Sequence, residues 1–143
     1  RMKQHCSNAE KVVNFLTKHK SVERGIYPTL HKGAVGDRAK KYFKGGNGAL
    51  VGIEVKGGVE AGKKFIEALK MFYHVANIGD ARSLAIHPAT TTHSQLNEEE
   101  LLAAGVTPGY VRLSIGIEHP DDIIADLDQA LGASGKPSLK AVS

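Results

Sequence analysis

The sequence predicts an α+β fold, a small and mostly antiparallel sheet with helices gathered on one face. Two segments, 49–55 and 110–117, alternate apolar with polar residues, which is the pattern of strands with one buried face. Other segments carry apolar residues at helical spacing. Helices and strands alternate irregularly along the chain, and antiparallel strands under one layer of helices is the simplest arrangement. Such a sheet leaves its other face to water or to a partner.

Local signals set the expected elements of the first half. Ser7 and Glu10 have capping-box spacing, with a hydroxyl at the cap and a carboxylate three residues later, so a helix is expected to begin at Ser7. The stretch after Pro28 is rich in glycine and charge, which indicates a loop. The expected elements are a helix from Ser7, a strand at 22–27, a mostly looped stretch at 29–48 with a short helix near 38–43, and a strand at 49–55.

The second half carries clearer start and stop signals. Asn97 is expected to cap a brief helix that ends at Gly105. Pro120 is expected to open the last helix, with acidic residues in its first turn, and Gly132 to stop it. The expected elements are a helix bearing Phe65, Ile66, Leu69 and Phe72 on one face, strands at 74–77 and 83–87, a helix from Asn97, a strand at 110–117 and a helix over 120–131.

Length and composition predict one domain. The 143 residues are enough for a single modest core, which we place at 1–132, followed by a flexible tail at 133–143. The formal charge of +4 is mild, and no aromatic platform accompanies the denser basic patch, so that patch is interpreted as solvated surface and no nucleic-acid partner is expected. It comprises Arg38, Lys40, Lys41 and Lys44. The lone Cys6 fits a reducing cytoplasm. The sequence contains no run of about 18 apolar residues, so no membrane span is expected.

The strand at 110–117 places one arginine opposite its apolar residues. Val111, Leu113, Ile115 and Ile117 are expected to point one way, and Tyr110, Arg112, Ser114 and Gly116 the other. If helices cover the first set, the Arg112 side chain lies on the uncovered face of the sheet. A planar guanidinium donates two parallel hydrogen bonds and so suits a carboxylate. Pattern alone leaves two interpretations open, a carboxylate-binding arginine and a solvated strand arginine.

Other candidate sites receive little support from the sequence. The polar run at 77–93 includes Thr90, Thr91 and Thr92, whose hydroxyls could satisfy local backbone groups in a turn. His87 and His93 have no nearby Cys, Asp or Glu that completes a recognised metal-ligand set. No serine, threonine or cysteine lies in a familiar nucleophile motif. The sequence alone therefore predicts no metal and no catalytic nucleophile.

Several stretches spanning residues 8–131 share one resemblance. They are Asn8-Ala9 through Val22, Tyr27-Pro28, Asn77-Ile78-Gly79-Asp80, Ser83-Leu84, His87 through Leu96 and Val111 through Glu118. Together they resemble the C-terminal region of the Cys/Met-metabolism family of pyridoxal-phosphate enzymes. The run His-Pro-Ala-Thr-Thr-Thr-His-Ser-Gln-Leu is specific. Asn-Ile-Gly-Asp and the triple threonine favour the O-acetylhomoserine sulfhydrylase branch over the lyase and cystathionine branches.

The resemblance implies a fold and a set of site residues. Such enzymes have a large domain that holds pyridoxal phosphate and a small C-terminal α+β domain that closes over the substrate. Arg112 would bind the carboxylate of the amino-acid substrate, and the Asn77-Ile78-Gly79 turn would line the same pocket. Thr91 and Thr92 would lie near it. The implied reaction converts O-acetylhomoserine and sulfide to homocysteine and acetate.

The resemblance also shows what this chain lacks. The family's cofactor-binding lysine lies in a Ser-x-Thr-Lys context, whereas this chain offers Leu16-Thr17-Lys18 inside an expected helix. No catalytic or cofactor-binding residue is therefore expected here, and the chain alone is expected to be inactive. The implied partners are the large domain of the same protein and, in the intact enzyme, further copies. The alternative hypothesis is a non-catalytic binding or assembly module that uses the exposed sheet face.

Overall fold

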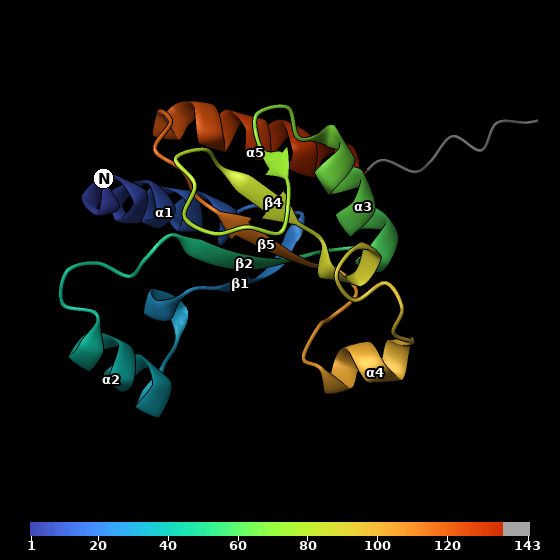
Figure 1. Cartoon of the computed structure of the whole chain (residues 1–143), viewed down its shortest axis with the longest axis horizontal. Coiled ribbons are helices and arrows are strands. Elements are labelled where there is room, and N and C mark those ends of the chain that lie inside the picture. Colours follow the sequence, from blue (N-terminus) through green and yellow to red (C-terminus); the bar gives the residue numbers. More distant parts are fainter. Residues whose placement is uncertain (136–143) are drawn as a thin grey trace, which may run out of the picture.

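A five-stranded sheet forms the centre of the computed structural model, which describes residues 1–135 (Figure 1). Its strand order is β1-β2-β5-β4-β3. The strands are β1 (Val22–Ile26), β2 (Leu50–Val55), β3 (Tyr73–His74), β4 (Leu84–Ile86) and β5 (Tyr110–Ser114). All neighbouring strands are antiparallel except β3 and β4, which are parallel. The prediction of a mostly antiparallel sheet in an α+β fold is confirmed.

Three helices cover one face of this sheet. They are α1 (Met2–Leu16), α3 (Gly58–Ala68) and α5 (Pro120–Ser134). α5 packs against both of the others, and Figure 1 shows α5 above the strands, with α1 on the left and α3 on the right. Phe65 of α3 and Leu127 of α5 are completely buried there, facing Ile53 of β2 and Val111 of β5, which belong to the same buried cluster. This layer is the hydrophobic core.

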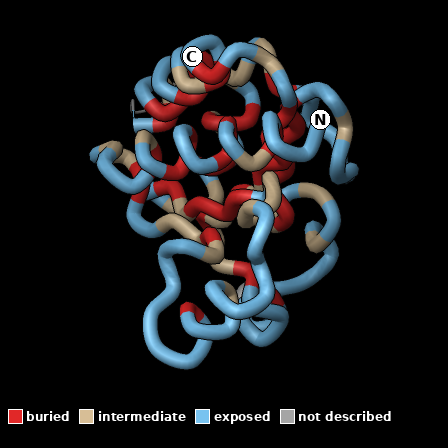
Figure 2. Tube along the Cα trace, turned by 90° about the vertical axis from the view of Figure 1, so that its left-hand side faces the viewer, coloured by how far each residue is buried: buried red, intermediate tan, exposed pale blue. Residues whose placement is uncertain are grey.

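The other face of the sheet is only partly covered. α2 (Gly33–Tyr42) follows the 3₁₀ helix η1 (Pro28–Leu30), and α4 (Glu98–Ala103) follows the 3₁₀ helix η2 (Pro88–Thr90). Both short α-helices lie below the strands in Figure 1. Figure 2 shows buried segments concentrated in the sheet and the layer above it, with mostly exposed segments below. The expected one-sided helix layer therefore holds for the three longer helices, while α2 and α4 flank an open face.

The start of α1 differs from the prediction. The helix begins at Met2, so Ser7 and Glu10 lie within it and form no capping box. Asn8 is fully buried, and its side-chain amide donates to the backbone carbonyls of Gly116 and Glu118. The polar residues that resembled a cap therefore lie inside a helix, and the asparagine among them is satisfied by a distant segment.

Two other boundaries differ in the first half of the chain. The short helix expected near 38–43 is longer and earlier, because α2 spans Gly33–Tyr42. The helix expected to carry Leu69 and Phe72 ends at Ala68. Beyond it the carboxylate of Asp126 accepts the backbone N–H groups of residues 70–72, which holds the chain in a turn. Phe72 is still buried, so the apolar pattern marked the core correctly but not the helix end.

The second half also departs from the expected bounds. β3 consists of Tyr73 and His74, not 74–77. β5 ends at Ser114. Beyond it the N–H of Gly116 donates to the Ser83 hydroxyl, which takes the chain out of the strand. Ile117 is therefore exposed and does not share the buried face. The capping box at Asn97 is confirmed.

The last helix starts as predicted but ends later. α5 begins at Pro120 and continues through Gly132 to Ser134. Gly132 does not adopt a positive φ, and the buried Leu131 and Ser134 on either side of it pack onto the core, so the glycine stays helical. Of the predicted flexible tail at 133–143, Ala133 and Ser134 are helical, and residues 136–143 lie outside the described residues.

Candidate functional site

Arg112 lies at the middle of the open sheet face. It is on the central strand β5, where it pairs with Gly52 of β2 on one side and with Ile86 of β4 on the other. Its neighbours Val111 and Leu113 are completely buried under the helices, whereas Arg112 itself is partly exposed. The predicted orientation of Arg112 is confirmed.

The Asn77–Gly79 turn lies beside this arginine. One terminal nitrogen of Arg112 donates to the carbonyl oxygen of Asn77 at 3.3 Å. The turn is closed by the Asn77 side chain, which accepts the N–H of Ile78 at 2.8 Å. Gly79 has a φ of +78°, a conformation that suits glycine. The structure therefore brings together four of the residues that the sequence singled out: Arg112, Asn77, Ile78 and Gly79.

A polar stripe on α1 supports the same region from the other side. Its members are Arg1, just before α1, His5 and Asn8, which share one face of the helix. Arg1 donates to the Gly79 carbonyl at 3.0 Å, and His5 Nδ1 lies 2.7 Å from the carbonyl oxygen of Ile115. Because a carbonyl only accepts, Nδ1 of His5 carries the proton. Nε2 of His5 is buried and has no hydrogen-bond partner among the described residues. These α1 contacts were not predicted, because they join residues about 80 to 110 positions apart in sequence.

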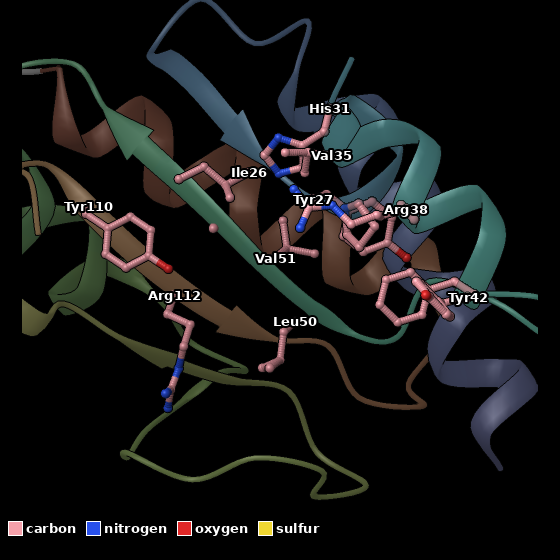
Figure 3. Close-up of a pocket in the computed structure, with 14 residues that line it drawn as sticks. Ile26, Tyr27, His31, Val35, Arg38, Tyr42, Leu50, Val51, Tyr110 and Arg112 are labelled. Carbon is pink, nitrogen blue, oxygen red and sulfur yellow. The ribbon is translucent and has the colours of Figure 1, made fainter. Parts of the chain in front are cut away.

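Two cavities open on this face. The larger, of about 670 Å³, lies between α2 and the sheet, with Arg112 in its wall (Figure 3). Its other lining residues are Ile26, Tyr27, Pro28, His31, Val35, Arg38, Ala39, Tyr42, Phe43, Leu50, Val51, Gly52 and Tyr110. The smaller, of about 450 Å³, is bounded by Arg1, His5, Ile78, Gly79 and Ser114 among others. Within residues 1–135, no lysine lines either of these cavities.

Tyr110 was not among the predicted site residues, although it shares the face of Arg112. Figure 3 shows the two side chains at the same end of the larger cavity, with Arg38 and Tyr42 at the other. Burial raises the pKa of the Tyr110 phenol, and the positive charge of Arg112 offsets part of that rise. The phenol is therefore a protonated donor near neutral pH. The two-residue strand period was the sequence signal that could have included it.

Thr91 and Thr92 lie apart from Arg112. They line a separate hollow of about 380 Å³ with residues 74–76 and Ile86. The hydroxyl of Thr91 donates to the carbonyl of His87 at 2.9 Å, and that of Thr92 lies 2.8 Å from His93 Nδ1. Ile86 connects this hollow to the site, because it pairs directly with Arg112. The two threonines therefore border the neighbouring strand β4, one strand removed from the arginine.

His87 fixes this threonine segment from inside. The ring is completely buried, with Nε2 2.8 Å from the Pro108 carbonyl and Nδ1 3.0 Å from the Thr90 hydroxyl. Nε2 must donate to that carbonyl, so Nδ1 accepts from Thr90. Burial lowers the pKa of His87, although its hydrogen bond to Pro108 opposes the shift. Both nitrogens of this neutral ring are hydrogen-bonded, so His87 has a structural role and offers no free nitrogen to a metal.

Two kinds of feature are absent from residues 1–135. That part of the chain contains no group of three or more His, Cys, Asp or Glu side chains placed to hold a metal ion. Within it, no helix has the length and apolar character needed to cross a membrane.

Comparison with known proteins identifies the family. A family model described as Cys/Met metabolism PLP-dependent enzyme matches residues 1–132. The chain belongs to this family. Pyridoxal phosphate (PLP) is thus the cofactor of the group to which it is related.

Individual relatives are sulfhydrylases and lyases. The chain is 56% identical to an O-acetyl-L-homoserine sulfhydrylase of Leptospira meyeri over 132 residues, which is 92% of the chain and 30% of that protein. It is 49% identical to O-acetyl-L-homoserine sulfhydrylase 1 of Thermus thermophilus (92% and 31%) and 49% identical to an L-methionine gamma-lyase of Fusobacterium nucleatum (92% and 33%). The chain spans about a third of the length of these relatives.

A solved structure supports the same assignment. The crystal structure of an O-acetylhomoserine (thiol)-lyase from Campylobacter jejuni superposes with a TM-score of 0.84 at 47% identity, covering 92% of this chain and 31% of that one. That protein carries a pyridoxyl-lysine phosphate residue. The fold of this chain is therefore that of one part of a PLP-dependent enzyme.

Proposed function

We propose that this chain is the substrate-closing, C-terminal part of a PLP-dependent O-acetylhomoserine sulfhydrylase. The observation that supports this most directly is Arg112, placed on the open sheet face beside the Asn77–Gly79 turn, in a chain whose relatives include O-acetylhomoserine sulfhydrylases. The reaction would convert O-acetylhomoserine and sulfide to homocysteine and acetate. The domain would extend to the end of α5 at Ser134.

The role proposed for Arg112 is to bind the α-carboxylate of the amino-acid substrate. A guanidinium has five N–H donors in a planar fork, and the Asn77 carbonyl engages only one nitrogen at a rather long 3.3 Å. The remaining donors can take a carboxylate in a bidentate pair. The strand holds the Arg112 backbone in the sheet, so the bound carboxylate would be fixed relative to the Asn77–Gly79 turn. Thr91 and Thr92 would border the site from their adjacent hollow.

The sulfhydrylase branch is favoured by two observations. The Asn77-Ile78-Gly79-Asp80 turn and the triple threonine at Thr90, Thr91 and Thr92 resemble that branch. The identity to the Leptospira meyeri sulfhydrylase is 56%, above the 49% to the Fusobacterium nucleatum lyase, while the Thermus thermophilus sulfhydrylase equals that lyase at 49%. A lyase activity on a sulfur amino acid is the nearest alternative reaction, and it would use Arg112 in the same way.

The cofactor would be held by another part of the protein. PLP, when bound, supplies an electron sink for substitution at the substrate side chain. Among the residues that the structure describes, no lysine lines the two cavities beside Arg112, so these cavities do not fit the cofactor. We infer that a large domain of the same protein supplies that lysine and that the isolated chain is inactive. Mixing the isolated chain with PLP is expected to give neither a cofactor–lysine absorbance band nor turnover.

The open face indicates where that domain would pack. Exposed apolar side chains gather there, including Val35, Tyr42, Phe43 and Leu50. Contiguous exposed apolar surface marks an interaction site. We propose that the large domain covers it, in a cytoplasmic homo-oligomeric enzyme. The alternative is a non-catalytic binding or assembly module that uses the same apolar face for a different protein.

Kinetics of the full-length protein test the proposal. Arg112→Ala should lower kcat/KM for O-acetyl-L-homoserine with sulfide by about 30- to 1000-fold, equivalent to roughly 2–4 kcal/mol, because it removes a charge-assisted bidentate pair. Arg82→Ala is a matched control, since Arg82 lies over the Tyr73 ring and lines neither cavity. An Arg112→Ala enzyme with wild-type kcat/KM would remove Arg112 from the site. A full-length protein that turns over neither this ester nor a sulfur amino acid would favour the binding module.

A further inference from the structure

Tyr110 occupies a distinctive place beside the proposed carboxylate site. It lies two residues before Arg112 on β5, so both side chains emerge on the open face. The two then lean in opposite directions. Arg112 reaches across β4 to the Asn77 carbonyl, whereas the Tyr110 ring lies over β2. A ligand held by Arg112 that extends under α2 must therefore pass the tyrosine.

A glycine creates the space in which the tyrosine ring lies. A Cβ atom placed on Gly52 would lie 2.8 Å from Cε2 of Tyr110 and 3.1 Å from its hydroxyl oxygen. Any larger residue at position 52 would displace the ring. Gly52 is also the cross-strand partner of Arg112. The same glycine thus sets the position of the phenol relative to the guanidinium.

The phenol is a donor without a hydrogen-bond partner in the described part of the chain. Tyr110 is half-buried, and its hydroxyl makes no hydrogen bond with any of the residues 1–135. Burial keeps it protonated at neutral pH. In Figure 3 its oxygen points into the larger cavity, along a wall formed by apolar residues that include Ile26 and Leu50. A fixed donor at the edge of an apolar cavity fits a ligand with a hydrogen-bond acceptor followed by a small apolar group.

We infer that Tyr110 determines specificity for the acylated substrate: its phenol donates a hydrogen bond to the acyl carbonyl oxygen of the amino-acid ester whose α-carboxylate Arg112 binds. This rests on the proposed function and adds to it a subsite for the acyl group, between β2 and α2. The other polar groups of the cavity suit this role less well. Tyr42 is 68% exposed, and the Arg38 guanidinium donates to the Ala34 carbonyl of its own helix.

The test compares two ligands on the full-length enzyme. O-acetyl-L-homoserine carries the acyl carbonyl, and L-norleucine, used as a competitive inhibitor, has the same carboxylate and amine without it. Tyr110→Phe should raise the KM for the ester by about 3- to 10-fold, the effect of one lost hydrogen bond, with kcat changed less than KM. The inhibition constant of L-norleucine should not change. Tyr73→Phe, which removes a phenol outside both cavities, is the matched control.

A second variant checks the result by a different route. Gly52→Ala keeps the Tyr110 hydroxyl in the protein but displaces the ring that carries it, so this change should also raise the KM for the ester selectively. Combined with Tyr110→Phe, it should add little, because the hydrogen bond is already lost. This double variant separates the hydroxyl from general disturbance of the sheet.

The other possible outcomes each contradict a different claim. Equal KM values for Tyr110→Phe and wild type would overturn the inference while leaving the proposed function intact. If Tyr110→Phe weakened the binding of the ester and of L-norleucine equally, Tyr110 would lie at the carboxylate and amine end that both ligands share. That result would overturn the assignment of Tyr110 to the acyl group. If the wild-type enzyme turned over no O-acyl amino acid, the proposed function would fail and the inference with it.

Discussion

The two faces of the sheet differ in what their residues contribute. On the face under α1, α3 and α5, alternate residues of β5 and β2 are completely buried, as Val111, Leu113 and Ile53 show. On the opposite face the same strands present Arg112, Tyr110 and Leu50, which are partly or largely exposed. The covered face therefore provides the stability of the fold, while the open face is free to bind. A single strand such as β5 serves both through its two-residue period.

Removing a core side chain should have the largest effect on stability. Phe65→Ala deletes a fully buried ring at the centre of the covered face, so the free energy of unfolding should fall by about 3–5 kcal/mol. Chemical denaturation of wild type and variant measures this. A loss below about 1 kcal/mol would show that the helix layer contributes less than its burial indicates, and would break the distinction between the faces.

An intermediate effect on stability is expected at His87, which directly follows β4. Its ring is buried against α3, where a Cβ on Gly62 would lie 2.6 Å from Nε2, and it also holds Thr90. Because burial lowers the folded-state pKa below that of the unfolded chain, the folded state binds fewer protons. The stabilisation is complete above a pH of about 6.5, the unfolded value, and is lost as the pH falls through it towards the folded pKa.

His87→Gln removes the titratable ring, while the glutamine amide can still form hydrogen bonds in its place. The free energy of unfolding of the wild type should therefore decrease more steeply between about pH 7 and pH 5 than that of the variant. Thermal or chemical unfolding at several pH values gives both slopes. Parallel slopes would mean that His87 does not titrate differently on folding.

The smallest effect on stability is expected on the open face. Leu50 is 41% exposed, so Leu50→Ser should change the free energy of unfolding by no more than about 0.5 kcal/mol. The same change removes apolar surface from the proposed contact with the large domain. Because the isolated chain leaves that surface exposed, we expect it to self-associate, and Leu50→Ser should reduce this self-association. Light scattering at high concentration measures the second effect. A large loss of stability would place Leu50 in the core instead.

Patterns of period and spacing predicted the layers of the fold. Alternation in 110–117 placed Arg112 on the open face, and helical spacing placed Phe65 and Ile66 on one helix face, which the structure buries. Element ends were less predictable because they depend on distant partners. The false cap at Ser7 and the false stop at Gly132 are both positions where tertiary packing extends a helix.

The candidate site was predictable only in part, for the same reason. The resemblance supplied Arg112 and the Asn77–Gly79 turn, which the structure brings into contact. It did not supply Tyr110, although the two-residue strand period places that residue on the face of Arg112. The contact between Tyr110 and Gly52 depends on the register between β2 and β5, which no local pattern reveals. The support from Arg1 and His5 likewise depends on a helix that lies far from the turn in sequence.

The polar stripe of α1 has a mechanical consequence. Arg1 is bonded to the turn at Gly79, while His5 and Asn8 are bonded to the chain that leaves β5 after Ser114. One rigid helix therefore spans both walls of the proposed carboxylate site. The walls can separate only if α1 tilts or if these bonds break. The width of the proposed carboxylate site beside Arg112 is thus coupled to the angle of α1, and a tilt of that helix would move the Gly79 turn relative to β5.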